Sequence, residues 1–194
     1  MMRQSVELLS YLRVAVNKPM PIVVMAGVGE ASGASAVVSG LAAAARECGL
    51  RMAVAELDGV PGRRVLRQRR WNGDDAPAAG AAAPEAADAA LGAALLVQPT
   101  ADHLERWLER SGADFVLIEA PPLDVAADSA LLARVCDGLV LVVESAVTSR
   151  DALRRAVRLA EASRCRLMGL VMREERRALP AWLRRLLRGT SRRG

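Results

Sequence analysis

Several features that would mark a membrane-spanning or secreted protein are missing from this chain. No apolar run reaches the roughly 18 residues that a membrane span requires, so no transmembrane helix is predicted. The N-terminus leads into an amphipathic stretch and lacks the apolar core and small-residue cleavage site of a signal peptide. These absences favour a cytoplasmic chain.

Cysteine and histidine are scarce as well, and both absences argue against a metal site. Cys48, Cys136 and Cys165 are odd in number and form no CxxC pair, which excludes an obvious disulfide framework or zinc site and fits a reducing compartment. The single histidine, His103, lies in a polar stretch, where a surface position is the simplest interpretation. One histidine does not build a typical metal centre, and no metal ligand is predicted.

Positive charge is abundant in one place only. The net charge of the chain is +5, but residues 173–194 contain eight arginines and two glutamates, a local +6 that leaves −1 for the remainder. The basic tail, residues 179–194, therefore points to an anionic partner, which is a membrane surface, a nucleic acid or an acidic protein face.

Short apolar segments that do not alternate with polar residues predict strands buried on both faces, as in a parallel sheet. These segments are residues 21–26, 52–57, 94–97, 115–120, 139–143 and 167–172. Helical patterns lie between them, at residues 35–48, 101–110, 129–135 and 149–163. Alternating strands and helices predict right-handed βαβ units and an α/β fold with a mostly parallel sheet.

The chain is expected to form one domain over residues 1–194. Residues 73–90 are almost entirely Ala, Pro, Gly, Asp and Glu and have too little bulky apolar surface to pack, so they are interpreted as a flexible loop. Two predicted strands precede this loop and four follow it, and they complete one sheet together.

A glycine-rich turn, residues 26–35 (AGVGEASGAS), connects the first predicted strand to a helix. In a P-loop, GxxxxGK[ST], such a turn directs backbone N–H groups at phosphate oxygens at a helix N-terminus. Here Gly33 and Ser35 flank Ala34, which replaces the lysine, and Val28 replaces the first glycine. Lys18 is the only lysine in the chain, so the loop cannot supply another. A purely structural turn is the alternative.

Seven segments, in order, resemble the cytoplasmic domain of bacterial tyrosine kinases (BY-kinases), which work with polysaccharide co-polymerases in capsule and exopolysaccharide export. Residues 7–13 (ELLSYLR) resemble ExxRxxR, 33–42 (GASAVVSGLA) resemble GKSTVAANLA, and 54–58 (VAELD) resemble the acidic DxD strand. Residues 114–122 (DFVLIEAPP), 136–143 (CDGLVLVV), 148–151 (TSRD) and 169–173 (GLVMR) are similar to DYVIIDTPP, ADGVLLVV, TTRD and GVVLN.

The resemblance implies a P-loop NTPase-like fold of the deviant Walker A type, related to MinD and ParA, with helices on both faces of the sheet. It also exposes departures from a working site. Lysine has become Ala34, two metal-side aspartates have become Glu56 and Glu119, and the adenine-reading asparagine has become Arg173. The tyrosine-rich tail is missing, since Tyr11 is the only tyrosine.

We therefore expect no catalytic residue and only a vestigial nucleotide site, with at most weak binding of ATP or ADP and Mg²⁺. Its candidate residues are Gly29, Gly33, Ser35, Asp58 and Glu119. Other interpretations remain for the polar members. Asp58 and Glu119 would cap helices or pair with arginines, and Ser35 would cap the first turn of its own helix.

Two amphipathic segments are candidate partner surfaces. The first sixteen residues predict a helix that either packs on the sheet or, as the resemblance implies, forms a homo-oligomer through Glu7 and Arg13. Residues 180–188 predict a second helix, which either packs on the core or docks through Trp182, Arg184 and Arg185. Nucleic acid is an unlikely partner because no recognition motif or aromatic platform accompanies the charge.

The sequence therefore predicts a non-catalytic, pseudokinase-like subunit that regulates or scaffolds exopolysaccharide or capsule polymerisation and export. It would be peripheral to the inner membrane, docked on a membrane polysaccharide co-polymerase. Two alternatives remain open. One is a residual ATPase of the MinD/ParA class that recruits a cation from a neighbouring protomer, and the other is a membrane or nucleic-acid adaptor that acts through the basic tail.

Overall fold

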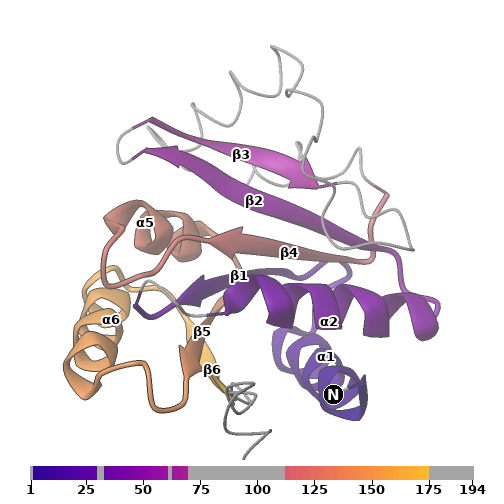
Figure 1. Cartoon of the computed structure of the whole chain (residues 1–194). Helices are drawn as coiled ribbons and strands as arrows, with labels where there is room; N and C mark the ends of the chain where they lie inside the picture. The colour runs from indigo at the N-terminus through magenta and orange to yellow at the C-terminus, as the bar shows by residue number, and fades with distance from the viewer. Residues whose placement is uncertain (1, 30–32, 61–62, 70–111, 175–194) are drawn as a thin grey trace, which may run out of the picture.

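The computed structural model describes residues 2–29, 33–60, 63–69 and 112–174. The helices and strands that it describes follow the predicted order, with one additional strand (Figure 1). The helices are α1 (Met2–Val16), α2 (Ala34–Glu47), α5 (Ala127–Val135) and α6 (Arg150–Ala162). The strands are β1 (Ile22–Gly27), β2 (Met52–Val60), β3 (Arg63–Arg69), β4 (Phe115–Ala120), β5 (Gly138–Glu144) and β6 (Leu167–Arg173).

The strands form one sheet with the order β3-β2-β4-β1-β5-β6. Five of them are parallel, because β2, β4, β1, β5 and β6 pair in parallel registers, whereas β3 runs antiparallel to β2. This arrangement confirms the predicted α/β fold with a mostly parallel sheet. β1 lies at the centre, where the loop that follows it is flanked by the carboxyl ends of β4 and β5.

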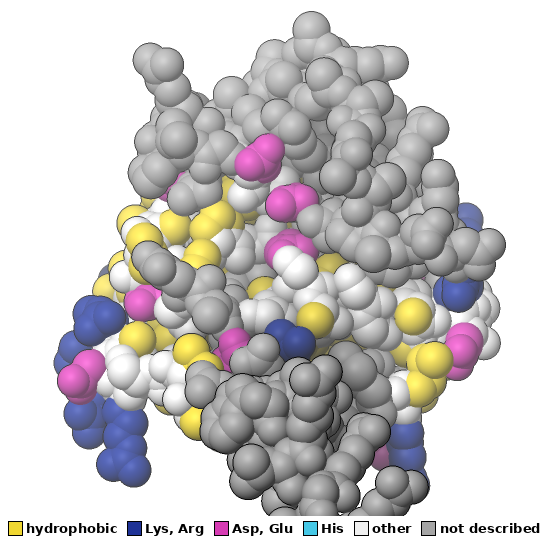
Figure 2. Space-filling view, in the orientation of Figure 1, with side chains coloured by type: hydrophobic (Ala, Val, Ile, Leu, Met, Phe, Trp, Pro, Cys, Tyr) yellow, Lys and Arg dark blue, Asp and Glu magenta, His cyan; other side chains and the backbone are white. Residues whose placement is uncertain are grey.

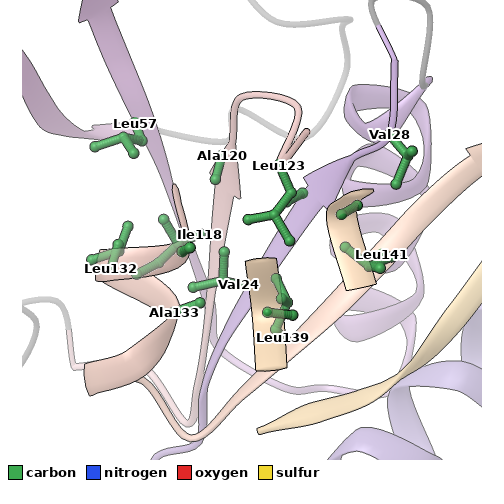
Figure 3. Close-up of a cluster of buried hydrophobic side chains, with 14 of the residues drawn as sticks. Val24, Val28, Leu57, Ile118, Ala120, Leu123, Leu132, Ala133, Leu139 and Leu141 are labelled. Atoms are coloured by element: carbon green, nitrogen blue, oxygen red, sulfur yellow. The ribbon is translucent and has the colours of Figure 1, made fainter. Parts of the chain in front are cut away.

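Both faces of the central strands β1, β4 and β5 are buried, which explains why these strands are almost entirely apolar. Val24 of β1 packs with Ile118 and Leu139 on the face covered by α5 and α6 (Figure 3). The alternate residues of β1, Val23 and Met25, pack on the opposite face beneath α1 and α2. The predicted placement of helices on both faces is thus confirmed.

The helix boundaries follow signals in the sequence. Gly49, with φ of +70°, follows α2 and allows the chain to leave the helix. The Ser149 side chain accepts a hydrogen bond of 3.1 Å from the Ala152 N–H at the start of α6. Leu9 and Leu12 of α1 are buried in the cluster under α2, so this helix packs on the core. Within the described ranges, every helix is too short or too polar to cross a bilayer.

One strand was not predicted. β3 follows β2 directly, so three strands rather than two precede residues 73–90. Its sequence, RRVLRQR, is mostly charged, and charge is tolerated there because β3 is an edge strand. The side chain of Leu66 in β3 is buried, at 1% exposure. Pro-Gly at positions 61–62 is a turn signal that would have indicated a hairpin.

Some predictions lie outside the described residues. These are the strand at 94–97, the helices at 101–110 and 180–188, the loop at 73–90, the basic tail at 179–194 and His103.

Candidate nucleotide site

The glycine-rich turn lies where a phosphate loop is expected, between the end of β1 and the start of α2. Gly29 has φ of +81°, and Gly33, the N-cap of α2, has φ of +59°. Both values lie in the left-handed region that favours glycine. Gly33 provides no side-chain cap, and its carbonyl accepts a hydrogen bond of 3.1 Å from the Ala36 N–H. Residues 30–32 of the turn are outside the described residues.

Ser35 and Glu119, both predicted site residues, are brought together. The Ser35 hydroxyl donates a hydrogen bond to Oε1 of Glu119, which lies near the carboxyl end of β4. Ser35 therefore does not cap its own helix in this structure. In a working P-loop this hydroxyl is a ligand of Mg²⁺. Here it contacts a carboxylate of the chain instead.

The remaining acidic positions lie along β2. Glu56 is in register with Glu119 on the neighbouring strand, whereas Asp58 is two residues further on, beyond the last pair with β4, and is in register with Val65 of β3. Figure 2 shows acidic side chains gathered in the upper centre of this face, over the region of β2 and β4. Among the described residues, no three His, Cys, Asp or Glu side chains are placed to hold a metal ion.

Asp124 is a site residue that the sequence reasoning missed. Its Oδ1 accepts a hydrogen bond of 2.8 Å from the Gly29 N–H, and its Oδ2 lies 3.6 Å from Nη2 of Arg155. The Asp124 side chain is only 4% exposed. A carboxylate of the chain thus occupies one of the backbone donors of the turn. Asp124 lies two residues after the Pro-Pro that follows β4, and this position alone does not indicate its partner.

Other contacts fix the first part of the turn. The Thr148 hydroxyl donates to the Val28 carbonyl at 3.2 Å and accepts from the Glu144 N–H at 3.0 Å. The Val28 N–H donates to the Val142 carbonyl at 3.0 Å. The turn is therefore tied to β5 and to the loop that follows it.

Arg173 covers the end of the turn that is next to α2, at Gly33. A Cβ atom added at Gly33 would collide with the Arg173 guanidinium, so the arginine side chain lies directly against this glycine. Arg173 comes from the end of β6, and its Nη1 is 4.0 Å from Oε1 of Glu144 on β5. By the resemblance, Arg173 replaces the asparagine that reads adenine, and the structure places its guanidinium at the phosphate turn.

Two of the three cysteines, Cys136 and Cys165, have thiols whose ionisation is disfavoured by burial. Burial raises the pKa of the Cys136 thiol far above its usual range, with a further contribution from the charge of Asp137. Burial also raises the pKa of the Cys165 thiol. Because the thiolate is the reactive form of cysteine, these raised pKa values disfavour nucleophilic reactions of both thiols.

The candidate partner residues of α1 are exposed and lie apart from the turn. Glu7 pairs with Arg3 on the same helix at 3.1 Å, with exposed fractions of 65% and 92%. Arg13 lines a groove of about 740 Å³ between α1 and the end of α2, together with Lys18. Trp182, Arg184 and Arg185 are outside the described residues.

The sheet, its covering helices and the turn after β1 have the arrangement of the P-loop NTPase-like α/β fold. No family model matches the chain. Over 59 residues, 30% of its length, the chain is 30% identical to the tyrosine-protein kinase CpsD of Streptococcus agalactiae. It is 29% identical over the same length to CpsD of the serotype III strain NEM316. The matched segment spans about a quarter of these relatives, 26% and 25% respectively.

Solved structures agree over most of the chain. The kinase domain of the Escherichia coli tyrosine kinase ETK superposes with a TM-score of 0.59 at 17% identity, covering 91% of this chain and 78% of that one. The BceF tyrosine kinase domain gives a TM-score of 0.61 at 19% identity, covering 88% and 75%. The chain is therefore similar to a bacterial tyrosine kinase in one segment of its sequence and to bacterial tyrosine kinase domains in its fold, in line with the resemblance of its motifs.

Proposed function

We propose that this protein is a non-catalytic, BY-kinase-like subunit that regulates or scaffolds exopolysaccharide or capsule polymerisation and export. The observation that carries the proposal is Ala34, which stands where a phosphate loop requires lysine. Loss of one charge-assisted phosphate contact costs about 1.5–3 kcal/mol, which is one to two decades in affinity. Catalysis loses more, because the lysine also stabilises charge on the transferred phosphoryl group.

The contacts around the turn support the same proposal. The Ser35 hydroxyl is bonded to Glu119, and the Gly29 N–H is bonded to Asp124. Two groups that would face Mg²⁺ or phosphate in a working site thus have partners within the chain. The residues present fit a nucleotide and its metal ion poorly, and any binding of ATP or ADP with Mg²⁺ is expected to be weak.

The proposed partners come from the resemblance of the sequence motifs and from the charge of the basic tail. We propose that the protein acts in the cytoplasm at the inner membrane, docked on a membrane polysaccharide co-polymerase. In this proposal, residues 180–188 contact the partner or anionic lipid through Trp182, Arg184 and Arg185. Self-association through Glu7 and Arg13 of α1 remains a prediction, and both side chains are exposed as it requires.

A substitution at Ser35 tests the non-catalytic role. In a host strain that lacks the native chain, Ser35→Ala is expected to restore polysaccharide output to the wild-type level. The change removes one exposed hydrogen bond, worth about 0.5–1.5 kcal/mol, so the fold persists. Polymer yield is measured alongside protein abundance by immunoblot. Loss of polymer at unchanged abundance would mean that the hydroxyl performs chemistry, and the proposal would be wrong.

A further inference from the structure

The Arg173 side chain connects three strands at their carboxyl ends. It starts at the end of β6, passes the end of β5 and reaches Gly33, which follows β1 in the chain. Its main chain is fixed as well, because Arg173 is in register with Glu144 and its carbonyl accepts a hydrogen bond of 2.8 Å from the Ser145 N–H. The arginine is therefore held at its backbone, and its guanidinium lies against Gly33.

Glu144 provides the countercharge that makes this position stable. Its side chain is 6% exposed, whereas that of Arg173 is 34% exposed. A buried carboxylate without a partner is strongly unfavourable. The guanidinium also lies at the N-terminus of α2, where the helix dipole disfavours a cation unless an anion is nearby. The ion pair meets both requirements, because it gives the buried Glu144 carboxylate a partner and places an anion near the Arg173 guanidinium.

The Arg173–Glu144 pair lies where the phosphate of a ligand would bind. Ligands of open α/β sheets bind outside the carboxyl ends of the strands, and a phosphate loop receives its ligand at the helix N-terminus. Arg173 lies against that N-terminus at Gly33. To act instead as the missing phosphate cation, Arg173 would have to leave Glu144 and abandon a buried carboxylate. Exclusion of the ligand is the outcome that the contacts favour.

We propose that Arg173, anchored by Glu144, is the residue that excludes nucleotides from the phosphate turn. This inference rests on the proposed function and adds a cause for it, because the site is closed by a side chain of the chain itself. It also accounts for Gly33 in a way that φ alone does not, since any side chain at this position would displace the guanidinium.

The test is a calorimetric titration of ADP with Mg²⁺ into the full chain and its variants. The double variant Arg173→Asn, Glu144→Gln removes the cation and neutralises its buried partner together. It is expected to bind ADP at least about tenfold more tightly than the wild type. Arg166→Asn is the matched control, because it removes an arginine just before β6 that bonds to the Ala15 carbonyl, away from the turn. The control is expected to bind like the wild type.

The second arm of the titration experiment restores a lysine in the turn. Ala34→Lys alone is expected to gain little, because Arg173 would still cover the turn at Gly33. Added to the double variant, the same change is expected to improve affinity by a further factor of about ten or more, so the substitutions are coupled.

The outcomes separate this inference from the proposed function. Wild-type ATP turnover would overturn the proposed function. An inert wild type whose folded double variant binds ADP no better would overturn only the role of Arg173. Folding is checked by circular dichroism and thermal unfolding. If the double variant is unfolded, Arg173→Gln, which removes the positive charge but keeps a polar side chain, is titrated in its place, and unchanged affinity again rejects the inference.

Discussion

Truncation of the chain after Arg177 is expected to abolish its binding to anionic vesicles and to the membrane partner. The removed residues contain five arginines and no acidic residue. Basic residues near an anionic bilayer contribute about 1 kcal/mol each, so the loss amounts to roughly 5 kcal/mol, or more than three decades in partitioning. Cosedimentation with anionic and with zwitterionic vesicles measures the change.

Two variants separate charge from apolar contact in the same segment. Arg184→Ala with Arg185→Ala is expected to weaken binding in a salt-dependent way, because the attraction acts over a screening length of about 8–10 Å. Trp182→Ala is expected to weaken it with little salt dependence, since its contribution is short-range burial. If the truncated chain binds vesicles and partner as well as the full chain does, the tail has no role in docking and serves only solubility.

Phe115→Ala is expected to destabilise the fold by about 3–5 kcal/mol, a large share of the roughly 5–15 kcal/mol of a typical domain. Phe115, the only phenylalanine, is fully buried at the start of β4, in the cluster beneath α1 and α2. Urea unfolding followed by circular dichroism measures the change in the free energy of unfolding.

Tyr11→Phe is the aromatic control for that experiment. Tyr11 is 53% exposed, and its hydroxyl donates a hydrogen bond of 3.1 Å to the Met168 carbonyl. Its loss is expected to cost about 0.5–1.5 kcal/mol. Similar effects of the two substitutions would contradict the burial of Phe115 between α1, α2 and the sheet.

Much of the fold was predictable because its determinants are local. The central strands are apolar at every position since both faces are covered, and this pattern identified β1, β4 and β5. Gly49 and Ser149 marked helix ends by backbone conformation and capping, which depend on a few neighbouring residues. β3 was not predicted because its sequence, RRVLRQR, has only two apolar residues and an edge strand needs few apolar side chains.

The site was less predictable because its contacts join distant segments. The motifs indicated the glycines of the turn and the acidic ends of β2 and β4. They carried no sign that Asp124 bonds to Gly29 across 95 residues of sequence, since an aspartate after a strand has many possible partners. The contact of Arg173 with Gly33 likewise depends on β5 lying between β1 and β6. Such contacts follow from the strand order, which the local sequence does not encode.

The central claim is that the protein performs no phosphoryl transfer. The most direct measurement is phosphate release from ATP, with and without Mg²⁺, combined with detection of phosphotyrosine on the purified full chain. With Ala34 in the turn and Ser35 bonded to Glu119, we predict release at the rate of the protein-free control and no phosphotyrosine. Turnover that depends on Mg²⁺, or phosphotyrosine that disappears in Ser35→Ala, would contradict the claim and would instead indicate a residual ATPase or kinase.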